Sequence, residues 1–74
     1  MRGIFKRSTP NDRLVQARIE RGLTNKQIAD RMDISLVTYN RWEQGRQKPG
    51  LRRLRLLCEI LQKECEELGY NPND

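Results

Sequence analysis

The chain has 74 residues, of which 35% are hydrophobic and 34% are charged, and its formal net charge is +5. This length allows one domain with a small core, and a chain without histidine and with only 2 cysteines lacks the ligands of a structural zinc site. No apolar run approaches the roughly 18 residues of a membrane-spanning helix, so we expect a cytoplasmic protein that needs no membrane, metal or other cofactor.

The N-terminal residues show no hydrophobic periodicity and contain the basic side chains Arg2, Lys6 and Arg7. We expect residues 1–9 to form a flexible basic arm, because chain ends of this kind are seldom held by the rest of a domain. Two interpretations of this arm stay open. It is either a disordered end or a segment that reaches the phosphates or the minor groove of DNA.

A helix start follows at Thr9-Pro10-Asn11-Asp12. We assign the Thr9 hydroxyl as the N-cap and Pro10 as the first helical residue, where the missing N–H of proline costs nothing. This helix is predicted over residues 10–21 and ends at Gly22, a residue suited to a left-handed helix terminus. Helical spacing directs four of its side chains toward the core: Leu14, Ala17, Arg18 and Ile19.

Thr24 and Gln27 have the spacing of a capping box, which predicts that a second helix begins there. Asp33 and Ile34 then leave room for a tight turn only, so a third helix must follow at once. The stripe of this second helix that should be buried consists of Ile28, Ala29 and Met32.

Ser35 offers the N-cap of the third helix, and Gly45 offers its left-handed stop. Between them Tyr39 and Trp42 stand three residues apart, so both aromatic side chains should face the core. Two short helices joined by a tight turn form a helix-turn-helix, whose second helix can enter the major groove of DNA.

These residues resemble the Cro/C1-type (XRE-like) helix-turn-helix family from about Leu14 to Leu68. The resemblance implies an all-α fold, a compact four- to five-helix bundle like the lambda-repressor DNA-binding domain, over residues 10–69, and a prokaryotic or phage-type, nucleoid-associated protein. Asp33 departs from the family, which usually has glycine at this turn position. The residues that carry the resemblance are Leu23-Thr24, Ile28-Ala29, Ile34-Ser35, Tyr39, Arg41-Trp42-Glu43-Gln44-Gly45 and Lys48-Pro49.

Arg18 is expected on the packed side of its helix, where a guanidinium without a partner would be costly. In the family this position commonly pairs with the glutamate of the RWExG segment, which is Glu43 here. The resemblance therefore implies a structural salt bridge between Arg18 and Glu43.

A fourth helix should follow the polar loop of residues 46–50 and cover the back of the helix-turn-helix. Two alternatives stay open for its end: a break at Lys63 before a short fifth helix, as in the family, or one continuous helix that stops at Gly69.

On a continuous helix Cys58 and Cys65 would be separated by about 10.5 Å of rise, beyond the reach of a disulfide, so we interpret them as reduced thiols. Residues 70–74 are predicted to be a tail or the start of a linker. The core-facing residues of the fourth helix are predicted to be Leu51, Leu54, Leu57 and Leu61, with Cys58 and Ile60 beside them and Leu56 at the margin.

Residues 46–56 contain five basic residues and no acidic one: Arg46, Lys48, Arg52, Arg53 and Arg55. Such a cluster directly after the third helix is placed to meet phosphates beside a groove. The candidate phosphate contacts are Asn25, Gln44, Arg46, Lys48 and Arg52.

The resemblance assigns base contacts to Leu36, Val37, Asn40 and Arg41. Arg41 can donate two hydrogen bonds to guanine, and Asn40 can bind adenine in the same bidentate way. A phosphate contact is the alternative for Arg41. Leu36 and Val37 can meet only thymine methyl groups or an apolar partner.

We therefore predict a sequence-specific transcriptional regulator, or the DNA-binding domain of one, that binds double-stranded DNA as a homodimer or together with an additional C-terminal domain. The alternative is a protein-interaction module on the same frame, an antitoxin or coactivator-like adaptor that grips its partner with Leu36 and Val37. An enzyme is not expected, because the chain has no histidine, no acidic pair in a pocket, no glycine-rich phosphate loop and no evident small-molecule site.

Overall fold

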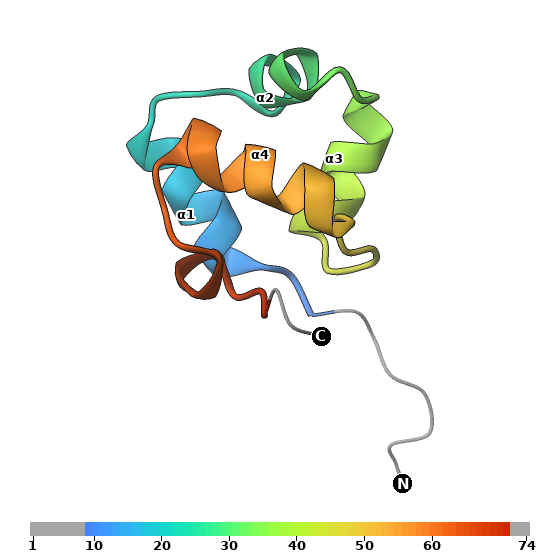
Figure 1. Cartoon of the computed structure of the whole chain (residues 1–74). Helices are drawn as coiled ribbons and strands as arrows, with labels where there is room; N and C mark the ends of the chain where they lie inside the picture. Colours follow the sequence, from blue (N-terminus) through green and yellow to red (C-terminus); the bar gives the residue numbers. More distant parts are fainter. Residues whose placement is uncertain (1–8, 72–74) are drawn as a thin grey trace, which may run out of the picture.

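The computed structural model describes residues 9–71 (Figure 1). Residues 1–8, which make up most of the predicted arm, and residues 72–74 of the predicted tail lie outside the described residues. No helix of the described part is both long and apolar enough to cross a membrane. The described chain forms four α-helices and one short 3-10 helix, with no strand: α1 (Asp12–Glu20), α2 (Asn25–Met32), α3 (Leu36–Glu43), α4 (Leu51–Leu61) and η1 (Cys65–Leu68).

The helix-turn-helix consists of α2 and α3, and its ends follow the sequence signals. The Thr24 hydroxyl accepts a hydrogen bond from the Gln27 backbone N–H at 3.1 Å, and the Gln27 amide oxygen accepts one from the Thr24 N–H at 2.8 Å. Asp33 holds the turn in the left-handed conformation, with φ 57° and ψ 44°. Ser35 caps α3 by accepting from the Thr38 N–H at 3.0 Å. The predicted capping box, turn and second N-cap are therefore confirmed.

The core lies between α1, α2, α3 and α4, and η1 packs against α1 and α4 (Figure 1). Tyr39 and Trp42 are both fully buried and meet edge to face, with ring centroids 5.9 Å apart. This arrangement confirms that both aromatic residues of α3 belong to the fold. The core residues are Leu14, Ala17, Ile28, Ala29, Met32, Tyr39, Trp42, Leu57, Leu61 and Leu68, with Leu54 also buried.

The start of α1 differs from the prediction. Asn11, not Thr9, is the N-cap: its side-chain oxygen accepts from the Leu14 N–H at 3.1 Å, and the helix begins at Asp12. Distant partners select this residue, because the Asn11 backbone N–H donates to the Glu43 carbonyl at 2.8 Å and its amide donates to the Leu68 carbonyl at 2.8 Å.

Two predicted core positions, Ile19 and Leu51, are wrong. Ile19 is 54% exposed, because α1 turns this side chain away from the bundle. Leu51 is 48% exposed, since the first turn of α4 has no neighbouring helix in the described chain. Leu56, predicted at the margin of this helix, is 39% exposed. Tyr70, assigned to the tail, instead packs against the hydrophobic core.

The break after α4 decides between the two alternatives for the C-terminal part. Gln62 takes the left-handed conformation, with φ 55°, and α4 ends at Leu61. Glu64 and Glu67 then form a second capping box that starts η1. The continuous helix is therefore wrong. The fifth element of the family is present as a single 3-10 turn, and the break lies one residue before Lys63.

The reversal of the chain at Gln62 corrects the estimate for the two cysteines. The sulfur atoms of Cys58 and Cys65 lie 3.0 Å apart, although both residues are free thiols. The predicted separation assumed one continuous helix, whereas the chain folds back and brings η1 beside the end of α4.

Candidate nucleic-acid interface

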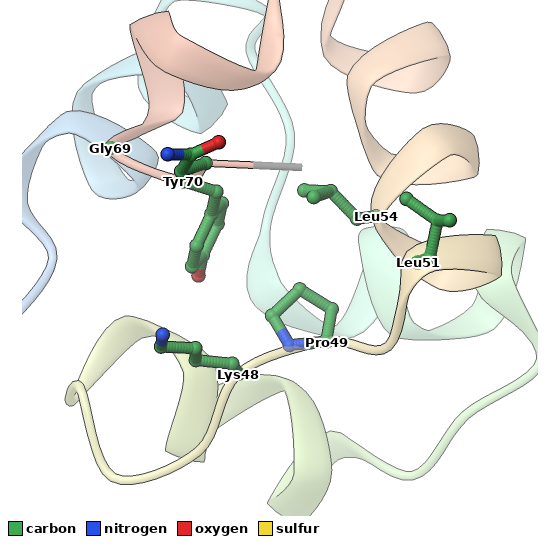
Figure 2. A pocket seen from close by; sticks show the side chains of 7 residues that line it. Lys48, Pro49, Leu51, Leu54, Gly69 and Tyr70 are labelled. Atoms are coloured by element: carbon green, nitrogen blue, oxygen red, sulfur yellow. The ribbon is translucent and has the colours of Figure 1, made fainter. Parts of the chain in front are cut away.

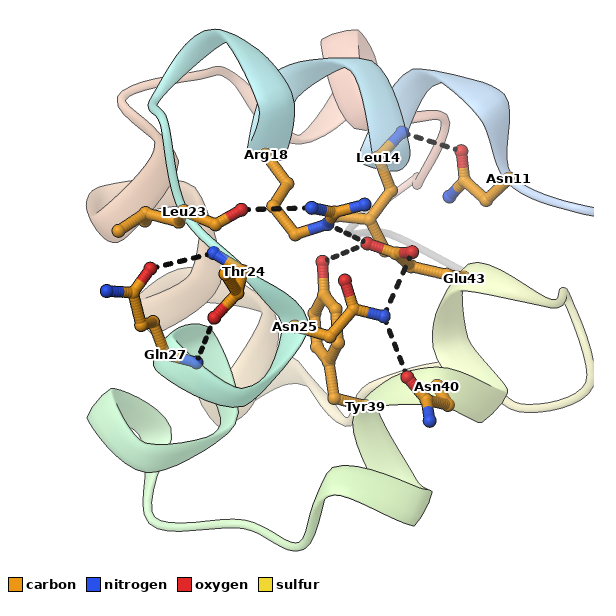
Figure 3. Close-up of polar contacts among 10 residues, drawn as sticks. All are labelled: Asn11, Leu14, Arg18, Leu23, Thr24, Asn25, Gln27, Tyr39, Asn40 and Glu43. Atoms are coloured by element: carbon orange, nitrogen blue, oxygen red, sulfur yellow. Dashed lines mark hydrogen bonds and ion pairs between the residues drawn. The ribbon is translucent and has the colours of Figure 1, made fainter.

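Five polar side chains meet between α1, α2 and the inner side of α3, and we call them the inner polar cluster (Figure 3). Glu43 accepts hydrogen bonds on one carboxylate oxygen from the Arg18 Nε and the Tyr39 hydroxyl, each at 2.7 Å. Asn25 donates its amide to Asn40 at 2.7 Å and lies 3.4 Å from the other Glu43 oxygen. The members are Arg18, Asn25, Tyr39, Asn40 and Glu43.

The inner polar cluster fixes α3 against the first two helices. The predicted ion pair is present between Arg18 and Glu43, whose side chains are only 17% and 11% exposed. Arg18 also donates to the Leu23 carbonyl at 2.9 Å, so its guanidinium is satisfied on two sides. Because a shielded charge is costly to leave without its partner, this pair sets where α3 sits.

Tyr39 acts as a donor within the cluster over the whole physiological pH range. Its burial, and then its hydrogen bond to Glu43 and the charge of that carboxylate, raise the pKa of the phenol well above its usual value. Tyr39 therefore keeps its proton and can hold the Glu43 carboxylate in one orientation.

The outer face of α3 carries three of the four predicted base-contacting residues. Leu36 is 42% exposed and Val37 is 58% exposed, and Arg41 is exposed one turn further along the helix. Asn40 differs, because it is half-buried and its amide oxygen already accepts from Asn25. The structure thus presents Leu36, Val37 and Arg41 freely and holds the Asn40 amide in a fixed orientation.

Four of the five candidate phosphate contacts are exposed along one continuous stretch of chain. Gln44 ends α3, Arg46 and Lys48 lie in the following loop, and Arg52 lies in the first turn of α4. Asn25 is the exception, because its amide belongs to the inner polar cluster. The group of Asn25 best placed to meet an anion is its backbone N–H at the start of α2.

The loop after α3 faces the C-terminal segment across a groove (Figure 2). A groove of about 170 Å³ separates Lys48 and Pro49 from Gly69 and Tyr70. This volume is below the roughly 300 Å³ at which small-molecule pockets begin.

Sequence reasoning found the pair of Arg18 and Glu43 but missed the other members of the inner polar cluster. Tyr39 and Glu43 are four residues apart on one helix, and this spacing could have signalled their contact. Asn25 and Asn40 lie on different helices, and no spacing rule links them. Their contact required the angle between α2 and α3.

Comparison with known proteins gives the same boundaries as the sequence motifs. The model of the helix-turn-helix family matches residues 14–68. The HTH-type transcriptional activator BcrR of Enterococcus faecalis is 28% identical to the chain over 58 residues, which are 78% of this chain. The chain spans 28% of the length of that curated relative. No solved structure gives a significant match.

Proposed function

The chain belongs to the Cro/C1-type helix-turn-helix family, and from this premise we propose that it binds duplex DNA through the outer face of α3 and regulates transcription. One observation carries the proposal. Tyr39 and Trp42 are buried on one side of α3, while Arg41 with the first residues of the helix is free on the other. An amphipathic helix of this kind can enter the major groove without disturbing its own fold.

Arg41 is the residue to which we assign most of the base recognition. Its guanidinium has the geometry to donate two hydrogen bonds to guanine O6 and N7, a contact worth roughly 1–3 kcal/mol in discrimination. Leu36 and Val37 fit thymine methyl groups at the start of the helix. We assign Asn40 a smaller part in base recognition, because its amide oxygen already accepts a hydrogen bond from Asn25.

The phosphate contacts are assigned to Gln44, Arg46, Lys48 and Arg52, which continue the chain directly after the base-facing helix. The backbone N–H groups at the start of α2 add a second anion-binding position on the other side of the groove. These contacts give affinity and orientation and carry no sequence information.

We propose that the specific site is larger than one copy of this domain covers. A single module of this size buries little surface on DNA, so operator recognition requires a homodimer or a further domain. The curated relative is a transcriptional activator of much greater length, which supports a regulator with additional parts. We propose no enzymatic activity for the domain.

The DNA-binding proposal is tested by measuring affinity for a mixed-sequence duplex at several salt concentrations. Three cationic contacts, Arg46, Lys48 and Arg52, should give a slope of about −3 in log Kobs against log salt. Replacing each one by alanine should reduce the slope by roughly one.

Arg21→Ala is the matched control, because it removes one exposed positive charge at the far end of α1 from α3 (Figure 1). This variant should leave the slope close to that of the wild type. An affinity that does not respond to salt would overturn the proposal and would instead fit an apolar protein partner at Leu36 and Val37.

A further inference from the structure

The two cysteines form a contact that the DNA-binding role does not use. Cys58 lies in the last turns of α4 and Cys65 is the first residue of η1, and their sulfur atoms are 3.0 Å apart. Both residues are half-buried, so a small reagent can reach them. The contact joins α4 to η1, which packs against α1 and α4, and neither cysteine is among the residues to which we assign a DNA contact.

The backbone holds both cysteines in place at this contact. The Lys63 N–H donates to the Cys58 carbonyl at 3.1 Å, and the Tyr70 N–H donates to the Cys65 carbonyl at 3.0 Å. The left-handed Gln62 makes the reversal that brings them together. The sulfur atoms therefore meet because of the fold of the chain, and little backbone movement is needed to join them.

We propose that Cys58 and Cys65 are a modification site, a reversible intramolecular disulfide that fastens η1 to α4 and is formed by exchange with a small disulfide of the glutathione class. This inference does not depend on the DNA-binding proposal. It concerns a covalent bond between α4 and η1, and neither of these elements supplies a residue to which we assign a base contact.

The two thiols have different roles in the exchange. Burial, and then the hydrogen bond with Cys65, raise the pKa of the Cys58 thiol to about 12, so Cys58 is the poorer first nucleophile. We therefore assign the first attack to the Cys65 thiolate, which joins one sulfur of the oxidant and releases one glutathione thiolate.

The second step closes the ring. The released thiolate takes the proton of Cys58, and the Cys58 sulfur attacks the Cys65 sulfur and displaces the second glutathione. The two protein thiols are oxidised to one disulfide, and the small disulfide is reduced to two thiols. A dithiol reductant reverses both steps.

The segment that the disulfide would secure is short, and few hydrogen bonds join it to the rest of the domain. The 3-10 turn η1 is anchored by the buried Leu68, by the Asn11 amide that donates to the Leu68 carbonyl at 2.8 Å, and by an exposed bond from Arg13 to Glu66 at 3.3 Å. Short segments with few bonds open first in native proteins. Fastening η1 should therefore slow the opening of this end of the domain.

The test incubates the whole chain with oxidised glutathione and follows intact mass, free-thiol content and Tm. We expect a monomer lighter by two hydrogen atoms, without free thiols, whose Tm is raised by roughly 5–15 °C and returns on reduction. Cys58→Ser should stop at a mixed disulfide between Cys65 and glutathione, and Cys65→Ser should react more slowly, because only the poorer nucleophile Cys58 remains. Neither variant should gain such a rise.

Three results would overturn the proposal: both thiols remain free, the wild type stops at the mixed disulfide or forms covalent dimers, or the internal disulfide forms without raising Tm. Circular dichroism of the two serine variants establishes that each folds. Should one of them unfold, the other gives the same comparison, because either substitution removes the internal bond.

Discussion

The two sides of α3 are built from different kinds of residue and are held in different ways. On the inner side, Tyr39, Trp42 and Glu43 are enclosed by α1, α2 and the core, and each polar group of Glu43 has a partner. On the outer side, Leu36 and Val37 stand exposed at the start of the helix. The inner side therefore fixes the helix in the fold, and the outer side leaves it available to a partner.

This difference implies that substitutions on the two sides have separable consequences. Changes on the inner side should lower the free energy of unfolding, because they leave buried groups without partners. Changes on the outer side should alter binding and leave stability almost unchanged. The predictions below run from the largest expected effect on stability to the smallest.

Glu43→Ala should have the largest effect on folding. The substitution leaves the Arg18 guanidinium, the Tyr39 hydroxyl and the Asn25 amide without their shared acceptor, and we expect a loss of about 3 kcal/mol in the free energy of unfolding. Urea denaturation measures this loss. Glu43→Gln, which keeps the shape and acceptor oxygen, should lose less, and an unchanged midpoint in Glu43→Ala would contradict the role of the cluster.

Gly45→Ala should cause the second-largest loss of stability. Gly45 follows the end of α3 with φ 74°, and an added Cβ would overlap the Thr9 carbonyl oxygen. The left-handed conformation and the overlap together should cost about 2 kcal/mol or more. Gly22→Ala is the matched control: its φ is 70°, but no heavy atom lies within 4 Å of an added Cβ. Equal thermal stability of the two variants would show that the N-terminal segment does not pack on this turn.

Tyr39→Phe should lower stability by about 1–2 kcal/mol at neutral pH, because the hydrogen bond to Glu43 is lost. The raised pKa of Tyr39 has a second consequence at alkaline pH. The folded state favours the protonated phenol, so its contribution is complete below the unfolded pKa of about 10 and is lost as pH rises above it.

As pH rises above about 10, the free energy of unfolding of Tyr39→Phe should therefore fall less steeply than that of the wild type. Some alkaline loss should remain, since burial also raises the pKa of Tyr70, and Tyr70→Phe should remove part of that remainder. Parallel stability curves for the wild type and Tyr39→Phe would show that the phenol is not protected in the fold.

Arg41→Ala should have the smallest effect on stability, within roughly 0.5 kcal/mol of the wild type, because its side chain is exposed on the outer face. The same denaturation assay checks it. A large loss would mean that Arg41 supports the fold, and the separation between the two sides of α3 would fail.

The sequence predicted those features of the helix-turn-helix that depend on residues close together in the chain. The capping box of Thr24 and Gln27, the cap at Ser35 and the spacing of Tyr39 and Trp42 each depend on residues within one helix, and all were predicted correctly. The pairing of Arg18 with Glu43 is long-range, and it was found through the family pattern.

Features that depend on distant partners were missed. Asn11 replaces Thr9 as the cap because Glu43 and Leu68 offer carbonyl groups that no local pattern reveals. The break after α4 was predicted only as one of two alternatives and was placed one residue late, at Lys63. Glutamine has no special preference for a left-handed terminus, and the apolar spacing continues past Gln62.

The roles of the residues on the outer side of α3 are the hardest to predict from the sequence, because these residues would be selected by contacts with a partner molecule and not by packing within the fold. Leu36, Val37 and Arg41 are exposed within the described residues 9–71, so packing does not select them there, and sequence reasoning could only transfer roles from the family. Their exposure agrees with those roles.

The most direct measurement compares the wild type and Arg41→Ala on two DNA targets, the duplex selected by the wild type from a random pool and a mixed-sequence duplex. We expect the variant to lose roughly 10- to 100-fold in affinity for the selected duplex and little for the mixed one, since a base contact acts only at its own base pair. An equal loss on both duplexes would show that Arg41 contacts phosphate, and the outer face of α3 would then not read sequence through this residue.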